Sequence, residues 1–120
     1  MESLLIILIP VLVTMESRGN PHAIGDDGEA VGILQIHEIM VDDVNRIVGC
    51  ELFKYSDRVN PEKCYNMARV YFGHYSKNLK GSKVDILVAM ARQWNGGPKG
   101  HKKKATREYG EKARFLIEAF

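Results

Sequence analysis

The residues from Glu16 to Ile36, ESRGNPHAIGDDGEAVGILQI, combine one carboxylate, a Gly-rich turn and a single Gln. Glu16 stands at the end of an apolar run, and the turn leads into a short apolar segment that carries Gln35. A shielded carboxylic acid that faces a groove with amide partners can protonate the oxygen between two sugars. This stretch therefore predicts acid-catalysed cleavage of a glycosidic bond, with Glu16 as the acid.

Two blocks of the sequence resemble lytic transglycosylases and goose-type lysozymes. Residues 16–21 and 32–36 look like the family's Glu-Ser … Gly-Leu-Met-Gln-Ile signature. Residues 92–98, with Tyr109 downstream, look like its Tyr-Asn-Ala-Gly-Pro … Thr … Tyr segment. The blocks occur in the family's order and together span most of residues 4 to 113. The resemblance implies a lysozyme-like fold and peptidoglycan glycan strands as the substrate.

The resemblance also implies how Glu16 works. In lytic transglycosylases this Glu protonates the oxygen between N-acetylmuramic acid and N-acetylglucosamine. It then takes the proton of the muramyl C6 hydroxyl, which closes a 1,6-anhydro ring without water. At the end of an apolar helix, Glu16 would have surroundings and a helix dipole that both favour the protonated acid.

A hydrolase of the goose-type lysozyme kind is the alternative. It must activate water, and an inverting enzyme holds a second carboxylate about 6.5–9.5 Å from the acid. Asp26 is the candidate for that role, although Asp26 and Asp27 beside Gly residues would equally make a good turn. A third interpretation is a non-catalytic glycan-binding module that has kept the fold and lost the chemistry.

Four further residues are carried over from the family as substrate contacts. Gln35 and Asn95 are expected to bind sugars, because amides both donate and accept hydrogen bonds. Trp94 replaces the family's usual Tyr, and its ring could stack on a sugar or only close a helix onto the core. Tyr109 matches the Tyr whose hydroxyl lies near the catalytic Glu, and it would also fit as a core residue.

The sequence departs from the family at two positions near this site. Gly25 stands where the bacterial transglycosylases have Ser, so one substrate contact is missing. His37 stands where goose-type lysozymes have an Asp. Ser17 is expected to support the backbone around Glu16 rather than to act as a nucleophile, because no triad spacing is present.

The composition is that of an ordinary globular protein, with 45% hydrophobic and 27% charged residues, and we expect one domain over residues 1–120. A net charge of +2 is too small to indicate nucleic-acid binding. Residues 101–104 and Arg107 form the most basic stretch, which is either a solvated loop or an attraction to an anionic polymer. The His and Cys residues lack metal-ligand spacing, so we expect no metal and no cofactor. We also expect a monomer.

The apolar run from Leu4 to Val13 is about half the ~20 residues that a membrane-spanning helix needs. It is preceded by Glu2 rather than by basic residues, and no small-residue cleavage site follows. We therefore predict a core helix and no recognisable signal peptide. The protein would act on the cell wall in the periplasm, outside the cell or from a virion.

The predicted fold class is mainly α, a lysozyme-like domain of about five helices with a small β-hairpin. The apolar run Val31–Ile36 could be one strand of that hairpin. The first helix, over residues 3–17, is apolar on nearly all sides and contains Pro10. The others are expected over 38–48, 61–78, 82–94 and 106–118. The inner face of the second is expected to hold Ile39, Met40, Val44 and Ile47. Cys50 and Cys64 could form a disulfide, or Cys64 could be a buried small hydrophobe.

Overall fold

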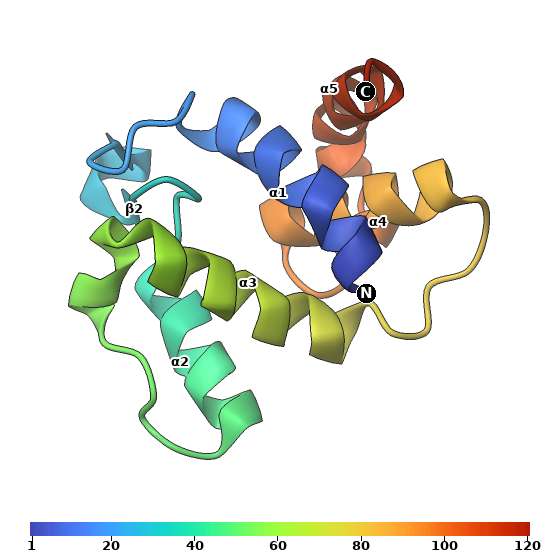
Figure 1. Ribbon diagram of the computed structural model, residues 1–120. Coiled ribbons are helices and arrows are strands. Elements are labelled where there is room, and N and C mark those ends of the chain that lie inside the picture. The colour runs from blue at the N-terminus through green and yellow to red at the C-terminus, as the bar shows by residue number, and fades with distance from the viewer. The chain divides into compact units, whose positions relative to one another are not determined.

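The computed structural model describes all 120 residues and is mainly helical, with one small sheet (Figure 1). The sheet pairs β1 (Ile24–Gly25) antiparallel with β2 (Ala30–Val31), and Ile24 lies opposite Val31. This confirms the predicted mainly α architecture with a small hairpin, and it is consistent with a lysozyme-like fold. The five helices are α1 (Glu2–Glu16), α2 (Glu38–Val48), α3 (Pro61–Tyr75), α4 (Lys83–Gly96) and α5 (Arg107–Glu118).

The chain divides into two compact units by its internal contacts. The terminal unit consists of Met1–Leu12 and Tyr75–Phe120, and the middle unit is Val13–His74. In the terminal unit α4 packs against α5, with Leu87, Met90 and Ile117 among the buried side chains. In the middle unit the fully buried side chains belong to α2, α3 and the residues just before α2. They include Leu34, Ile36, Val41, Val44, Met67 and Phe72.

Helix α1 has one buried face rather than being buried on all sides. Leu5, Leu8 and Leu12 recur at helical spacing and are buried, whereas Ile6 and Pro10 are exposed. Pro10 lies inside the helix and cannot donate to the carbonyl of Ile6. Both residues lie on the exposed side of the helix, so water can donate a hydrogen bond to the carbonyl of Ile6. The helix therefore continues to Glu16.

The sequence signals for helix ends are confirmed where a polar side chain caps the first turn. The amide of Lys63 donates to Asn60 Oδ1 at 3.1 Å, and the amide of Asp85 donates to Ser82 Oγ at 3.1 Å. Helix α2 has the predicted bounds. Helix α3 ends at Tyr75, three residues earlier than expected.

One prediction about the side chains of the middle unit is wrong, and one question that the sequence left open, the state of Cys50 and Cys64, is answered. Ile39 was expected on the inner face of α2 but is 77% exposed, and Val41 is buried instead. Cys50 and Cys64 are both free, so the structure contains no disulfide between them. Cys64 is buried, and burial raises the pKa of its thiol to about 11, which makes it an inert core residue.

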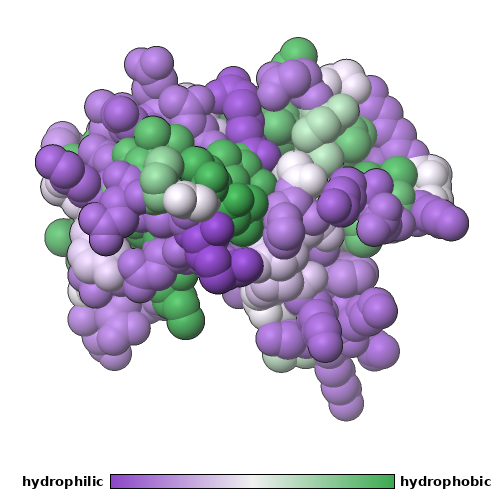
Figure 2. All heavy atoms as spheres, turned by 90° about the horizontal axis from the view of Figure 1, so that it is seen from below, coloured by the Kyte–Doolittle hydropathy of each residue, from purple (hydrophilic) through white to green (hydrophobic).

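On the face shown in Figure 2, hydrophilic side chains predominate and hydrophobic ones form separate areas among them. None of the helices combines the length and the hydropathy that crossing a membrane would require. The most exposed large hydrophobic side chains are scattered along the sequence, at Ile6, Ile24, Ile39, Phe115 and Phe120.

A close approach between two backbone segments fixes the middle unit. Gly32 has a φ of +89°, and a Cβ at this position would collide with the carbonyl oxygen of Arg58. The same oxygen accepts a hydrogen bond from the thiol of Cys64 at 3.1 Å. Only Gly satisfies both the left-handed conformation and the lack of space.

We predict that Gly32→Ala lowers the free energy of unfolding by about 2–5 kcal/mol, because strain and overlap add. The matched control is Gly49→Ala. Gly49 has a similar φ of +92° but no atom within 4 Å of the position of a Cβ. It should therefore lose only about 1–2 kcal/mol from the backbone conformation. Urea unfolding of both variants measures the difference, and equal losses would contradict the close approach.

Candidate active site

Glu16 is the last residue of α1 and is half-buried. The next residue, Ser17, ties this helix end to the segment that carries Gln35. The hydroxyl of Ser17 donates to the carbonyl of Ile33 at 2.7 Å and accepts from the amide of Gly19 at 3.2 Å. Ser17 thus supports the backbone beside Glu16, as predicted from the sequence.

The turn between β1 and β2 holds Asp26 in a left-handed conformation. Asp26 has a φ of 49° and Asp27 a φ of 56°, values that Asp tolerates better than most residues. The side chain of Asp26 is largely exposed. The turn therefore presents its carboxylate outward at the tip of the hairpin.

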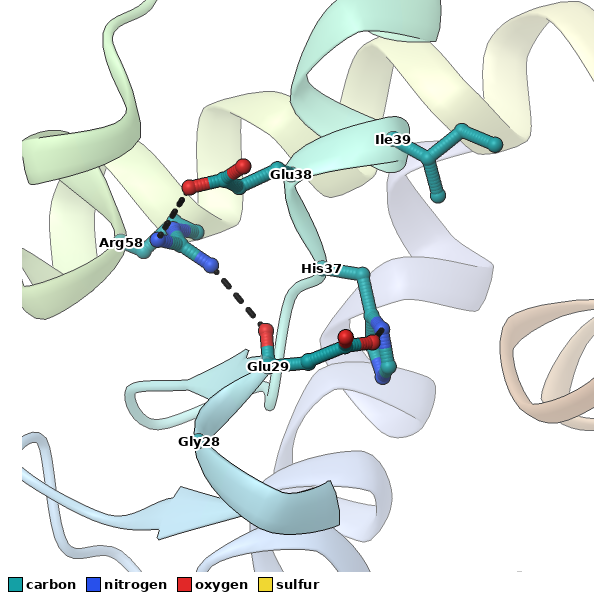
Figure 3. A pocket seen from close by; sticks show the side chains of 6 residues that line it. All are labelled: Gly28, Glu29, His37, Glu38, Ile39 and Arg58. Carbon is teal, nitrogen blue, oxygen red and sulfur yellow. Dashed lines mark hydrogen bonds and ion pairs between the residues drawn. The ribbon is translucent and has the colours of Figure 1, made fainter.

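Asp26 is paired with His37, which the sequence did not predict. His37 Nε2 lies 2.9 Å from Asp26 Oδ2. On the other side of the ring, His37 Nδ1 lies 3.9 Å from Glu29 Oε2 (Figure 3). His37 immediately precedes α2, so the start of this helix brings the imidazole to the hairpin. One of the two carboxylate oxygens of Asp26 is therefore engaged by a neighbouring ring.

Gln35 uses its amide nitrogen to hold the backbone. Its Nε2 donates to the carbonyls of Ala23 and Gly32, each at 3.0 Å, and its own φ is 53°. The oxygen Oε1 lies beside Gly25, where a Cβ would collide with it. Gly at position 25, in place of the family's Ser, thus leaves room for the Gln35 side chain, whose Oε1 is the atom left for a ligand.

A pocket of about 270 Å³ opens beside this hairpin, and sequence reasoning missed it (Figure 3). Arg58, almost fully buried, forms one wall. Its guanidinium donates to the carbonyls of Tyr55 at 2.9 Å, Glu29 at 3.2 Å and Ile36 at 3.1 Å. Its Nη2 also lies 3.7 Å from Glu38 Oε2. No spacing in the sequence signals these contacts, because Arg58 lies more than 20 residues from two of its partners.

The exposed Ile39 also lines this pocket. It is thus part of a wall that otherwise consists of polar and charged residues and Gly28. This location accounts for the wrong expectation that Ile39 packs into the core. The structure has no group of three or more His, Cys, Asp or Glu side chains arranged to hold a metal ion.

The six residues expected at the site divide between the two units. Glu16, Asp26 and Gln35 belong to the middle unit, whereas the other three belong to the terminal unit. Trp94, in the last turn of α4, is 6% exposed, and most of its ring is packed. Asn95 follows it and is exposed. Tyr109 is half-buried in the first turns of α5.

Comparison with known families identifies the chain. The family model of the transglycosylase SLT domain matches residues 2–117, which include both sequence blocks and all six expected site residues. A search of curated proteins gives no significant match. The chain belongs to the transglycosylase SLT family. Members of this family are peptidoglycan lytic transglycosylases, so the chain is an enzyme that acts on peptidoglycan in the cell wall.

In this SLT domain, Ser17 fixes the end of α1, where the Glu-Ser block lies. The hydrogen bond from Ser17 to Ile33 joins this end to the turn that carries Gln35. Losing it would leave a half-buried carbonyl without its donor and would loosen Glu16.

We predict that Ser17→Ala lowers the free energy of unfolding by about 1–2 kcal/mol and reduces the rate of peptidoglycan cleavage. The control is Ser56→Ala, because Ser56 is exposed and its hydroxyl forms no hydrogen bond. Urea unfolding and turbidity clearing of purified cell walls give the two readouts. If Ser17→Ala behaved like Ser56→Ala in both, the tie to Ile33 would be irrelevant to the site.

Proposed function

We propose that this SLT domain cleaves the β-1,4 bond between N-acetylmuramic acid and N-acetylglucosamine with Glu16 as both general acid and general base. The reaction leaves 1,6-anhydromuramyl ends. The observation that carries this proposal is the position of Glu16 at the half-buried end of α1, inside the Glu-Ser block of a chain that the SLT model matches almost throughout.

In the first step, Glu16 donates its proton to the glycosidic oxygen. The bond from that oxygen to C1 of the muramyl residue breaks, and the N-acetylglucosamine leaves as an alcohol. Positive charge develops at C1, and the carboxylate formed on Glu16 is available to stabilise it.

In the second step, the Glu16 carboxylate takes the proton of the muramyl C6 hydroxyl. The C6 oxygen then bonds to C1 and closes the 1,6-anhydro ring. The proton that Glu16 gave in the first step is thereby restored, and no water is consumed. One carboxyl group is sufficient for the whole cycle.

The pairing of Asp26 with His37 supports this route over hydrolysis. A carboxylate that activates water needs an oxygen free to accept the proton of that water. At Asp26 one oxygen is 2.9 Å from His37 Nε2, so only the other oxygen remains for a water molecule. We therefore assign Asp26 to holding the hairpin, and we keep the goose-type hydrolase as the alternative.

The substrate contacts that we propose follow from the chemistry of each side chain. Gln35 would accept a hydrogen bond through Oε1, because its Nε2 is bonded to backbone carbonyls. Asn95 is exposed and offers both a donor and an acceptor to an N-acetyl group. Trp94 could reach a sugar only with the exposed edge of its ring. Tyr109 is proposed to hold the Glu16 carboxylate through its hydroxyl.

We predict that Glu16→Gln lowers the rate of peptidoglycan cleavage by about 10²–10⁴-fold, because an amide cannot donate or take the proton. Glu51→Gln is the control, since Glu51 is exposed in the same unit and should leave the rate unchanged. Clearing of purified walls gives the rate, and circular dichroism checks that both variants fold. An active Glu16→Gln enzyme would refute the assignment of the acid.

We predict that Asp26→Asn keeps both the rate and the product close to those of the unchanged enzyme. Mass spectrometry of the released muropeptides measures the product. Anhydro ends are lighter than reducing ends by the mass of one water molecule. A loss of about 100-fold in rate, together with reducing ends from the unchanged enzyme, would instead favour the hydrolase with Asp26 as its base.

A further inference from the structure

The net charge of +2 hides a strong separation of charge between the units. The terminal unit has 11 basic and 5 acidic residues, a formal charge of +6. The middle unit, which holds Glu16, has 6 basic and 10 acidic residues, a formal charge of −4. Any attraction to an anionic polymer must therefore come from the terminal unit.

Within the terminal unit the positive charge is concentrated between α4 and α5. Residues 92–107 contain six basic residues and no acidic one. Lys99, Lys102, Lys104 and Arg107 are exposed and form no ion pair with any carboxylate. Burial, with Lys102 and Arg92 nearby, lowers the pKa of His101.

A pocket of about 290 Å³ lies between the two helices, with arginines from both of them on its walls. Arg92 comes from α4, whereas Arg107 and Arg114 come from α5. Gly110 makes room in this wall, because a Cβ there would lie 2.8 Å from Cδ of Arg92. The glycine thus allows the stem of Arg92 to pack closely against α5.

Arg92 is held in place before any ligand arrives. Its Nε donates to Thr106 Oγ1 at 2.8 Å, and its Nη2 donates to the carbonyl of Lys103 at 2.6 Å. The remaining donors of this guanidinium are not used by these two bonds. An oxyanion that binds here would meet an ordered donor, so less side-chain entropy is lost on binding.

Arg107 is the second arginine at this pocket that can donate hydrogen bonds to a ligand, because no carboxylate is paired with it. Arg114 is bonded to Asp85 at 2.8 Å and is neutralised by it. Glu111 is the only acidic residue in the lining, and it forms no ion pair with Arg107 one helical turn before it. A planar carboxylate matches the fork of a guanidinium, and a second arginine in the lining of the same pocket favours it further.

We propose that the pocket between α4 and α5 binds a carboxylate of the peptides carried by peptidoglycan, with Arg92 and Arg107 as its donors. This polymer is the substrate of the family, and its peptides carry carboxylates along the strand. The proposal depends on peptidoglycan as the substrate but not on the role of Glu16.

The test is a titration of the whole protein, labelled with ¹⁵N, with muramyl dipeptide at low salt. This ligand has one sugar and no glycosidic bond to cleave, so its binding is independent of which residue catalyses the reaction. We expect shifts at the amides of Arg107, Gly110 and Glu111. Blocking the carboxylate of the dipeptide as its amide should weaken binding about tenfold.

Arg107→Gln should weaken binding of the dipeptide by a similar factor, and Arg107→Lys should lose less because it keeps the charge. Lys80→Gln is the control, because it removes one exposed positive charge from the same unit outside the pocket. Equal binding of the dipeptide and its amide, shifts outside the pocket, or equal effects of Arg107→Gln and Lys80→Gln would overturn the proposal. Tighter binding of inorganic phosphate at the same amides would also overturn it, in favour of a phosphate-bearing polymer.

Discussion

The middle unit depends on one buried arginine. The guanidinium of Arg58 donates to the nearby carbonyl of Tyr55 and to those of Glu29 and Ile36, which are 29 and 22 residues away in sequence. Its own carbonyl lies against Gly32 and accepts from Cys64. A buried charge is tolerated only when its donors are satisfied, so each of these carbonyls must stay where it is. The loop before α3 is thereby fastened to the hairpin and to the residue before His37.

This fastening explains how so short a sheet can hold a strained turn. β1 and β2 have two residues each, too few to fix the hairpin by themselves. Asp26, Asp27 and Gln35 nevertheless adopt left-handed conformations, which cost energy in residues other than Gly. Contacts of Arg58 and of the Gln35 amide offset that cost. The result is a rigid edge on which Asp26, His37 and Gln35 have fixed neighbours.

The helices were predictable because their signals are local. Asn60 before Pro61, and Ser82 before Asp85, are caps that act within one turn, and apolar spacing marked α4. The apolar run Val31–Ile36 predicts a strand, yet β2 covers only Ala30–Val31, and Ile36 pairs with Val31 in an isolated bridge around a tight turn. That turn depends on Gly32 meeting Arg58, a contact that periodicity cannot reveal. Glu16 was recognisable from its motif, whereas the pair of Asp26 and His37 joins residues with no motif in common.

The separation of charge bears on how an SLT domain can work on an insoluble polymer. The unit that carries Glu16 is acidic, and an anionic strand would not be drawn to it by charge alone. The basic terminal unit can supply that attraction, whereas Glu16, the proposed acid, belongs to the other unit. Salt screens the attraction between exposed charges, so this attraction weakens as the ionic strength rises. Proton transfer at a half-buried carboxyl is not weakened in the same way. Binding of the strand and cleavage of its glycosidic bond would then respond differently to ionic strength. One site that performed both tasks could not separate these two responses.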